Sequence, residues 1–331
     1  EYTIAYTGNY TTSADANEES NMPIVSDVTQ ADVVVVGGGI TGLATAYEVQ
    51  KAGRSVVVLE ASDYVGGRIM TRERNGDIVE VGQQYFLSTY SQASKLLDEI
   101  GMTSELIEEG PEIVQYIDKK GKSRVISSET DLVRALGVRG SADLARATLQ
   151  YSTMGKAFPT YGLDRCIEEY DDITAAEGFA WAGEKFMDFI VRPMCYGNAG
   201  TALEHTSLFD AIRLFRSNLK QPKHYGFRGG NRALPRKLAE LVPVMLNAEV
   251  SELLTTGDAV TGAKLADGRT IGAGHVILCT TPNVAARLTP AMFERAKAFL
   301  SDFDHTRLAL AYFYLDRPVC PSSEHSAQLA A

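Results

Sequence analysis

The chain has 331 residues, of which 45% are hydrophobic and 22% are charged, and its formal net charge is −10. This length predicts two domains or one large discontinuous domain, and the acidic balance argues against a nucleic-acid partner. No run of 18 apolar residues occurs, so we expect no membrane-spanning helix, and attachment to a membrane surface is not indicated. Four widely spaced cysteines without a C-x-x-C pair, and five scattered histidines, predict reduced thiols, no metal site and a cytoplasmic location.

The first regular elements are predicted between residues 32 and 60. Asp32–Val36 is an apolar, β-branched run of the kind that forms a buried parallel strand. It leads into the G-x-G-x-x-G turn Gly37–Gly42 and then into a helix over Leu43–Ala52. A second apolar strand, Arg54–Leu59, follows. This order of elements is typical of dinucleotide binding, the alternative being an ordinary strand-to-helix turn that binds nothing.

The glycines of the turn have separate physical tasks. Gly37 permits the tight turn, Gly38 and Gly39 let backbone amides approach a pyrophosphate, and Gly42 lets helix and strand pack closely. The start of the helix offers unpaired N–H groups to the same phosphates. Glu60 ends the second strand, 18 residues beyond Gly42, near the spacing at which an acid accepts a hydrogen bond from an adenosine ribose. A carboxylate there would repel a 2′-phosphate, which argues against NADP.

The residues that follow point to the cofactor. Glu60 and Ala61, followed by Gly66, Gly67 and Arg68, resemble the E-A-x-x-x-x-G-G-R element of FAD-dependent enzymes in the amine oxidase, protoporphyrinogen oxidase and phytoene desaturase superfamily. The resemblance implies that the glycine pair brings backbone to the FAD diphosphate. It also implies that Arg68 lies beside that diphosphate, where a planar, permanently charged fork suits a pyrophosphate.

The segment Gly76–Phe86 resembles the part of the family that runs along the flavin toward its ring. Gln84, Tyr85 and Phe86 match the positions nearest the isoalloxazine, and Gln83 is also expected to bind the cofactor. The alternative for this stretch, above all for Phe86, is strand and core packing. Gln84 and Tyr85 are the best candidates for contacts with the flavin edge. No residue is assigned as a catalytic acid or base, because the flavin itself carries the chemistry in this family.

A second stretch of resemblance begins at Tyr225–Asn231, ahead of a predicted helix over Ala233–Leu241. It resembles the family's return to the FAD domain. There, the resemblance implies that Val250 contacts the adenine through its backbone, and that Thr280 lies near FAD after the strand His275–Cys279. The alternative for Val250 is a position in the core of a strand.

The middle of the chain is predicted to be helical. Ser91–Ile100 carries an apolar stripe at helical spacing. Thr174 and Glu177 form a capping box, which opens a helix that we expect to bury several phenylalanines and to end at Pro193. Another helix is expected over Thr206–Asn218. The basic stretch 132–156 is read as a solvated helix face, with a lid or a membrane-facing patch as alternatives.

Both ends of the chain depart from the family pattern. Members close with a glycine–acid motif that holds the ribityl chain, and none follows the expected strand Arg307–Leu315. Residues 1–20 contain Gly8 and Asn9 in a context that resembles this motif, with Asn in place of Asp. One interpretation is a displaced FAD-binding element in a permuted chain. The other is a solvated polar leader.

The sequence therefore predicts an α/β fold with a discontinuous Rossmann-like FAD-binding domain and an inserted, mostly helical substrate domain. Residues 31–87 and 225–290 are assigned to the first, with 1–20 added on the permuted interpretation. Residues 88–224 and 291–331 are assigned to the second.

The expected function is hydride abstraction by FAD from an amine or a similar apolar small molecule. The first alternative is carotenoid-desaturase-like or porphyrinogen-oxidase-like C–C dehydrogenation on the same scaffold. The second is a non-catalytic FAD-binding subunit that a partner chain, or a second copy in a homodimer, completes.

Overall fold

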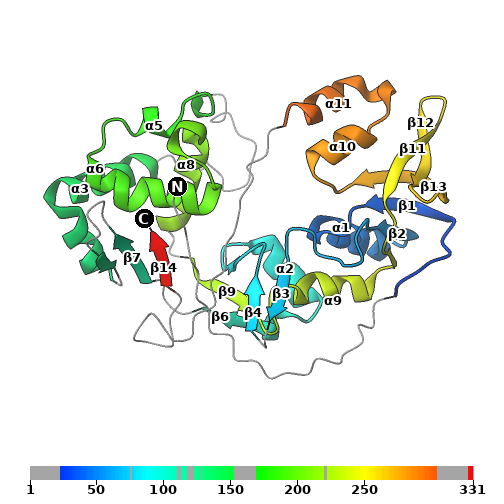
Figure 1. Cartoon of the computed structure of the whole chain (residues 1–331), viewed down its shortest axis with the longest axis horizontal. Coiled ribbons are helices and arrows are strands. Elements are labelled where there is room, and N and C mark those ends of the chain that lie inside the picture. Colours follow the sequence, from blue (N-terminus) through cyan, green and yellow to red (C-terminus); the bar gives the residue numbers. More distant parts are fainter. Residues whose placement is uncertain are drawn as a thin grey trace.

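The computed structural model describes residues 23–74, 77–109, 113–117, 123–126, 128–152, 169–219, 222–303 and 327–330. Gly8 and Asn9, and the strand expected over Arg307–Leu315, lie outside these residues. Figure 1 shows two bodies, which we call the sheet region (residues 23–109 and 222–303) and the helical region (residues 128–152 and 169–219).

A six-stranded sheet organises the sheet region, in the order β10-β2-β1-β13-β12-β11. The strands are β1 (Gln30–Val36), β2 (Val56–Leu59), β10 (Val244–Met245), β11 (Val250–Thr256), β12 (Ala259–Leu265) and β13 (Thr270–Leu278). The first four in spatial order run parallel, and β12 and β11 add to them antiparallel. The parallel strands are apolar because both of their faces are buried, and Val34, Val35, Val57 and Val58 are fully enclosed. The Rossmann-like prediction is confirmed.

Helices cover both faces of this sheet. On one face, α1 (Ile40–Lys51) joins β1 to β2 and packs with α9 (Ala233–Leu241) in a core that includes Leu43 and Leu238. On the other face, α10 (Pro282–Leu288) places Leu288 against β11 and β12. The turn η6 (Ala291–Phe293) and α11 (Glu294–Ser301) then pack beside α10.

Smaller elements extend the sheet region toward the helical region. They are β3 (Thr71–Arg74), β4 (Asp77–Glu80), β5 (Phe86–Leu87), α2 (Ser91–Glu99), η1 (Thr103–Glu105), β6 (Leu106–Glu108) and β9 (His224–Phe227). Leu97, Ile100 and Met102 belong to the same core cluster as Val33 and Leu43. The segment after residue 87 therefore shares a hydrophobic core with β1 and α1. The domain boundaries drawn from the sequence stay a prediction.

The helical region has an aromatic interior. Its helical elements are α3 (Glu129–Ser152), α5 (Ala175–Gly178), α6 (Glu184–Phe186), η3 (Met187–Val191), α7 (Arg192–Met194), η4 (Cys195–Ala199), η5 (Leu203–His205) and α8 (Leu208–Leu219). Tyr151 meets Phe179 and Phe215 edge to face, and Phe186 lies between Phe215 and Trp181. Leu208, Ile212 and Phe215 are buried, as the stripe over Thr206–Asn218 predicts. A three-stranded sheet of β7 (Ile113–Ile117), β8 (Ser123–Ile126) and β14 (Ala327–Ala330) adjoins this region in Figure 1.

The prediction of one helix from Thr174 to Pro193 is wrong. The capping box at Thr174 is present, but α5 ends at Gly178, where an added Cβ would lie 2.4 Å from Leu208. A second helical run begins at Glu184 and continues through Pro193 to Ala199, with π-helical turns before and after α7. Pro193 lies inside this continuous run, between the two π-helical turns, so its missing N–H removes one hydrogen bond to the turn before it. None of the helices in the described parts of the chain is long and apolar enough to cross a membrane.

Candidate cofactor site

Two glycines of the turn are required by the chain's own packing. Gly37 has φ = 108°, and a Cβ there would lie 2.7 Å from the carbonyl oxygen of Cys279. A Cβ on Gly42 would lie 1.9 Å from the carbonyl oxygen of Gly37. Both distances are far inside van der Waals contact, so α1 can approach β1 and β13 only if these positions lack side chains.

Gly39 is different, because nothing in the described chain requires a glycine there. Its φ of −72° suits any residue, and a Cβ would enter open space with no atom within 4 Å. It is the N-cap of α1, and no side chain caps that helix end. Open space in front of uncapped helix N–H groups fits the pyrophosphate of a dinucleotide.

Glu60 holds the turn in place. One carboxylate oxygen accepts a 2.6 Å hydrogen bond from the Gly38 N–H, and the other accepts from the Ser62 N–H at 2.9 Å. Each oxygen has a second lone pair, so the carboxylate can still accept from ribose hydroxyls. Ala61, next in the chain, is exposed.

The second glycine motif lies directly against the first. The Gly66 N–H donates to the Gly38 carbonyl at 2.9 Å, and a Cβ on Gly67 would lie 3.4 Å from the Gly39 Cα. Both glycines have positive φ, 119° and 56°. Arg68 follows with an exposed side chain at the same edge.

The segment Gly82–Tyr85 follows Arg68 along this edge, and we call it the flavin loop because the sequence resemblance predicts that it borders the flavin. A Cβ on Gly82 would lie 2.0 Å from the Arg68 carbonyl oxygen, and the Gln83 N–H donates to that oxygen at 3.0 Å. The side-chain amide of Gln84 donates to the Glu80 and Gly82 carbonyls, at 2.8 Å each, so it braces its own segment.

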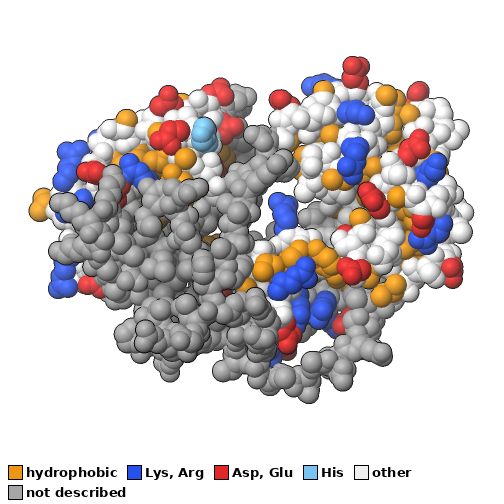
Figure 2. Space-filling model, viewed as in Figure 1, with side chains coloured by type: hydrophobic (Ala, Val, Ile, Leu, Met, Phe, Trp, Pro, Cys, Tyr) orange, Lys and Arg blue, Asp and Glu red, His pale blue; other side chains and the backbone are white. Residues whose placement is uncertain are grey.

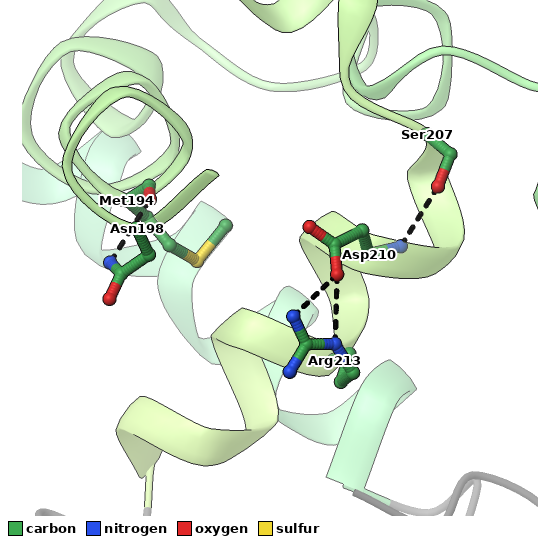
Figure 3. A network of polar contacts seen from close by, with 5 residues as sticks. All are labelled: Met194, Asn198, Ser207, Asp210 and Arg213. Atoms are coloured by element: carbon green, nitrogen blue, oxygen red, sulfur yellow. Dashed lines mark hydrogen bonds and ion pairs between the residues drawn. The ribbon is translucent and has the colours of Figure 1, made fainter. Parts of the chain in front are cut away.

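Tyr85 lies where the two regions meet. Its ring stacks on His224 of β9 at a centroid distance of 4.3 Å, and its hydroxyl donates to Asn198 Oδ1 at 3.4 Å. Asn198 is fixed in η4 because its Nδ2 donates to the Met194 carbonyl (Figure 3). Arg213 and Asp210 form an ion pair on the neighbouring α8 in the same view.

Val250 and Thr280 are the last two residues that the sequence resemblance predicts to lie near FAD. Val250 is buried in the sheet core, and the adjoining Ala248 N–H donates to the Glu60 carbonyl at 2.8 Å. Thr280 lies beside Gly37, with its methyl group 3.4 Å from the position of an added Cβ. Cys279, next to it, is a free thiol whose pKa is raised by burial. The structure therefore brings the glycine turn, Glu60, the second glycine motif, the flavin loop and Thr280 into one continuous edge.

Sequence reasoning missed two buried groups behind this edge. Glu80 is 6% exposed, and burial raises the pKa of its carboxyl despite hydrogen bonds from the Asn231 N–H and the Thr71 hydroxyl. Asn231 is 4% exposed and donates from its side chain to the flavin loop. The available signal was a carboxylate in the otherwise apolar run Ile78–Val81.

A cavity of about 180 Å³ lies on the inner side of this edge, between α1, α2 and α9. Its lining is mostly apolar, with two amides: Ile40, Ile69, Gln83, Phe86, Tyr90, Ala93, Phe227, Asn231 and Leu234.

On the outside, Figure 2 shows acidic and basic side chains interspersed over the visible face of the sheet region.

Comparison with known proteins gives a consistent result. Residues 40–328 match the model of the family described as flavin-containing amine oxidoreductase. The chain is 32% identical over 197 residues to coproporphyrinogen III oxidase of Propionibacterium freudenreichii, covering 58% of this chain and 36% of that protein. It is 41% identical over 95 residues to flavin-containing amine oxidase B of Mus musculus, covering 28% and 18%.

The fold agrees as well. A solved structure of wild-type putrescine oxidase bound to putrescine superposes with a TM-score of 0.65 at 24% identity, covering 78% of this chain and 60% of that one. The chain thus spans less than two thirds of the length of each of these three relatives.

Proposed function

The chain belongs to the flavin-containing amine oxidoreductase family, which supports FAD as its cofactor. We propose that it is an oxidoreductase that removes a hydride from the carbon beside the nitrogen of a small-molecule amine, so that the C–N bond is oxidised to C=N. One observation carries the proposal. One edge of the sheet region is formed by segments up to about 240 residues apart in the sequence, and its glycine spacing suits a dinucleotide. These segments are Gly37–Gly42, Glu60, Gly66–Arg68, Gln83 and Thr280.

Each part of this edge has a binding task in the proposal. The N–H end of α1 in front of Gly39, with the Gly66–Gly67 backbone and the Arg68 guanidinium, holds the diphosphate. Glu60 accepts from the ribose, and Val250 lies near the adenine. Gln83, Gln84 and Tyr85 border the flavin, which supplies the hydride acceptor when bound.

The helical region is assigned to the substrate. We propose that FAD binds to residues within 31–87 and 225–290, and that the substrate side is formed from residues 88–224 and 291–331, of which 88–109 and 291–303 lie in the sheet region. The contact between Tyr85 and Asn198 supports a substrate path near this junction, because it joins the flavin loop to the helical region. Tyr85 would then exclude water on that side of the flavin.

The test is a spectrum followed by a substrate screen. Purified protein should show flavin absorption and release FAD, not NAD, on denaturation. Anaerobic addition of amines, including diamines, should bleach the flavin band. Bound FAD that no amine reduces would contradict the amine oxidase activity, and bound FAD that neither amines nor a porphyrinogen reduces would favour a non-catalytic subunit. A protein that takes up no FAD would contradict the whole proposal.

A second candidate reaction is C–C dehydrogenation of a porphyrinogen. The 32% identity to coproporphyrinogen III oxidase over 197 residues favours it. The same anaerobic experiment separates the two, because coproporphyrinogen III would bleach the flavin, which accepts two of the six electrons that separate the porphyrinogen from the porphyrin, whereas amines would leave the flavin oxidised.

The role of Glu60 is tested by Glu60→Gln. This change keeps the size of the side chain but weakens acceptance from the ribose and from the Gly38 N–H, and hydrogen bonds to charged groups contribute roughly 1.5–3 kcal/mol. The dissociation constant of FAD should rise about tenfold or more in an apoprotein titration. Glu48→Gln on the exposed side of α1 is the control and should leave it unchanged. An equal, small effect of both changes would argue against ribose binding by Glu60.

A further inference from the structure

We infer that Asn231 is a positioning residue, which fixes the peptide planes of the flavin loop in the orientation that meets the flavin ring. The inference rests on the proposed function, since it assumes that FAD binds along this edge. It concerns a residue that belongs to neither glycine motif and that lies about 150 residues from the loop it holds.

The side-chain amide of Asn231 joins two segments that are distant in sequence. Its Nδ2 donates to the carbonyl of Gln83 at 3.0 Å and to the carbonyl of Gln84 at 3.1 Å. Both amide hydrogens are therefore used. A flipped amide would set Oδ1 against two carbonyl oxygens, so the contacts themselves determine the orientation of the amide.

The geometry of the peptide bond gives these contacts a consequence. In a planar trans peptide, the carbonyl of one residue and the N–H of the next point in opposite directions. Holding the carbonyls of Gln83 and Gln84 toward Asn231 turns the N–H groups of Gln84 and Tyr85 toward the opposite side. The amide of Asn231 thus decides which face of the flavin loop carries donors.

Asn231 is itself anchored by a buried carboxylate. Its backbone N–H donates to Glu80 Oε1 at 2.7 Å, and Glu80 Oε2 accepts from the Thr71 hydroxyl at 2.8 Å. The Thr71 oxygen in turn accepts from the Arg232 N–H at 3.0 Å. The turn that carries Asn231 is thereby tied to β3 and β4 on both sides of the residue.

Steric contact leaves this turn little freedom. Gly230 has φ = 92°, and a Cβ there would lie 2.6 Å from the Thr71 methyl carbon and 2.9 Å from Glu80 Oε1. A backbone hydrogen bond from the Gln83 N–H to the Arg68 carbonyl also ties the loop to another segment. The flavin loop is therefore held from the diphosphate side by Arg68 and from the far segment by Asn231.

The decisive variant is Asn231→Ala in the full chain, compared with the wild type and with Asp143→Ala. Asp143 is a matched control, because it is also 4% exposed and holds the Gly183 N–H and the Arg139 guanidinium in the helical region, away from the loop. Thr71→Val is a milder second variant that loosens the anchor of Asn231 without touching the loop. Three quantities are measured: the dissociation constant of FAD, the melting temperature with and without FAD, and the flavin absorption maximum.

Asn231→Ala should weaken FAD binding about tenfold, shift the flavin absorption maximum and reduce the gain in melting temperature on adding FAD. Thr71→Val should change the same three quantities in the same direction by a smaller amount. Asp143→Ala should lower the melting temperature equally with and without FAD, and leave affinity and spectrum unchanged.

If Asn231 had a purely structural role, Asn231→Ala would behave like Asp143→Ala and leave FAD affinity and the flavin spectrum unchanged. If Asn231→Ala and Thr71→Val bind FAD with wild-type affinity and spectrum, the positioning role is wrong while the proposed function stands. Should Asn231→Ala not fold, Thr71→Val decides alone. Failure of the wild type to bind FAD would overturn both proposals.

Discussion

At its glycines the sheet region packs backbone on backbone, whereas aromatic side chains fill the interior of the helical region. At Gly37, Gly42 and Gly82, a single added carbon would lie within 2.7 Å of a carbonyl oxygen of another segment. Around Phe179 and Phe186, ring centroids lie 5.6–6.4 Å from those of their neighbours, so side chains fill this interior.

The difference has a physical consequence. Where backbone contacts backbone, no Cβ can be added, but most nearby side chains can be exchanged without disturbing the contact. Contacts between rings tolerate conservative exchange of shape, but not the loss of volume. The two regions should therefore fail under opposite kinds of substitution, small to large in one and large to small in the other.

The largest expected effect is that of Phe186→Ala. Phe186 is fully buried and meets Trp181, Phe179 and Phe215, so its removal leaves a cavity and should cost about 3–5 kcal/mol of unfolding free energy. Denaturant titration measures the loss. FAD affinity of the folded fraction should change little, because Phe186 lies away from the glycine edge. A large loss of FAD affinity would show that the two regions depend on one another.

The opposite kind of change is Gly42→Ala. The new Cβ would overlap the Gly37 carbonyl, so α1 must move from β1, and we expect a loss of about 3 kcal/mol together with weaker FAD binding. Unfolding curves with and without FAD measure both effects. Wild-type stability would mean that the close approach of turn and helix is not a constraint on the fold.

These two residues also show what a sequence can predict. The task of Gly42 follows from its spacing, because glycine positions and strand runs are local patterns. The helix over Ala233–Leu241 was predicted with its observed bounds for the same reason. The run through Pro193 was not, because π-helical turns and the packing of Gly178 on Leu208 depend on tertiary contacts.

Gly39→Ala should affect FAD affinity more than folding stability. Its Cβ would enter open space at an ordinary φ, so the unfolding free energy should change by about 1 kcal/mol or less, the difference between Gly and Ala at an N-cap. A methyl group in front of the α1 N-terminus should nevertheless obstruct a diphosphate and raise the dissociation constant of FAD about tenfold or more. Gly197→Ala is the matched control in η4, since its Cβ also meets nothing within 4 Å. Equal FAD affinities for both variants would remove the diphosphate from this position.

In the candidate site, as in the fold, local motifs could be predicted from the sequence and contacts between distant segments could not. The motif around Glu60 and Arg68 could be predicted from residue spacing, and the structure ties both Glu60 and Gly66 to Gly38. The tie between Asn231 and the flavin loop could not be read, because it joins distant segments through one side chain and a buried carboxylate. Hydrogen bonds of this kind leave no periodic pattern in the sequence.

The smallest effect concerns the capping box of α5, and it depends on pH. Thr174 Oγ1 accepts from the Glu177 N–H, while the Glu177 carboxylate accepts from the Thr174 N–H and hydroxyl. Thr174→Ala should cost about 1 kcal/mol, measured by denaturant titration at neutral pH.

The hydrogen bond from the Thr174 N–H, and then that from its hydroxyl, lower the pKa of Glu177 from its ordinary value of 4.5. A lowered folded-state pKa means that the unfolded chain binds the proton more tightly, so this stabilisation is complete above about pH 4.5 and is lost as pH falls through the folded-state pKa. The difference in stability between wild type and Glu177→Gln should therefore shrink on acidification. A difference that stays constant from pH 7 to pH 3 would show that the carboxylate charge contributes nothing to the cap.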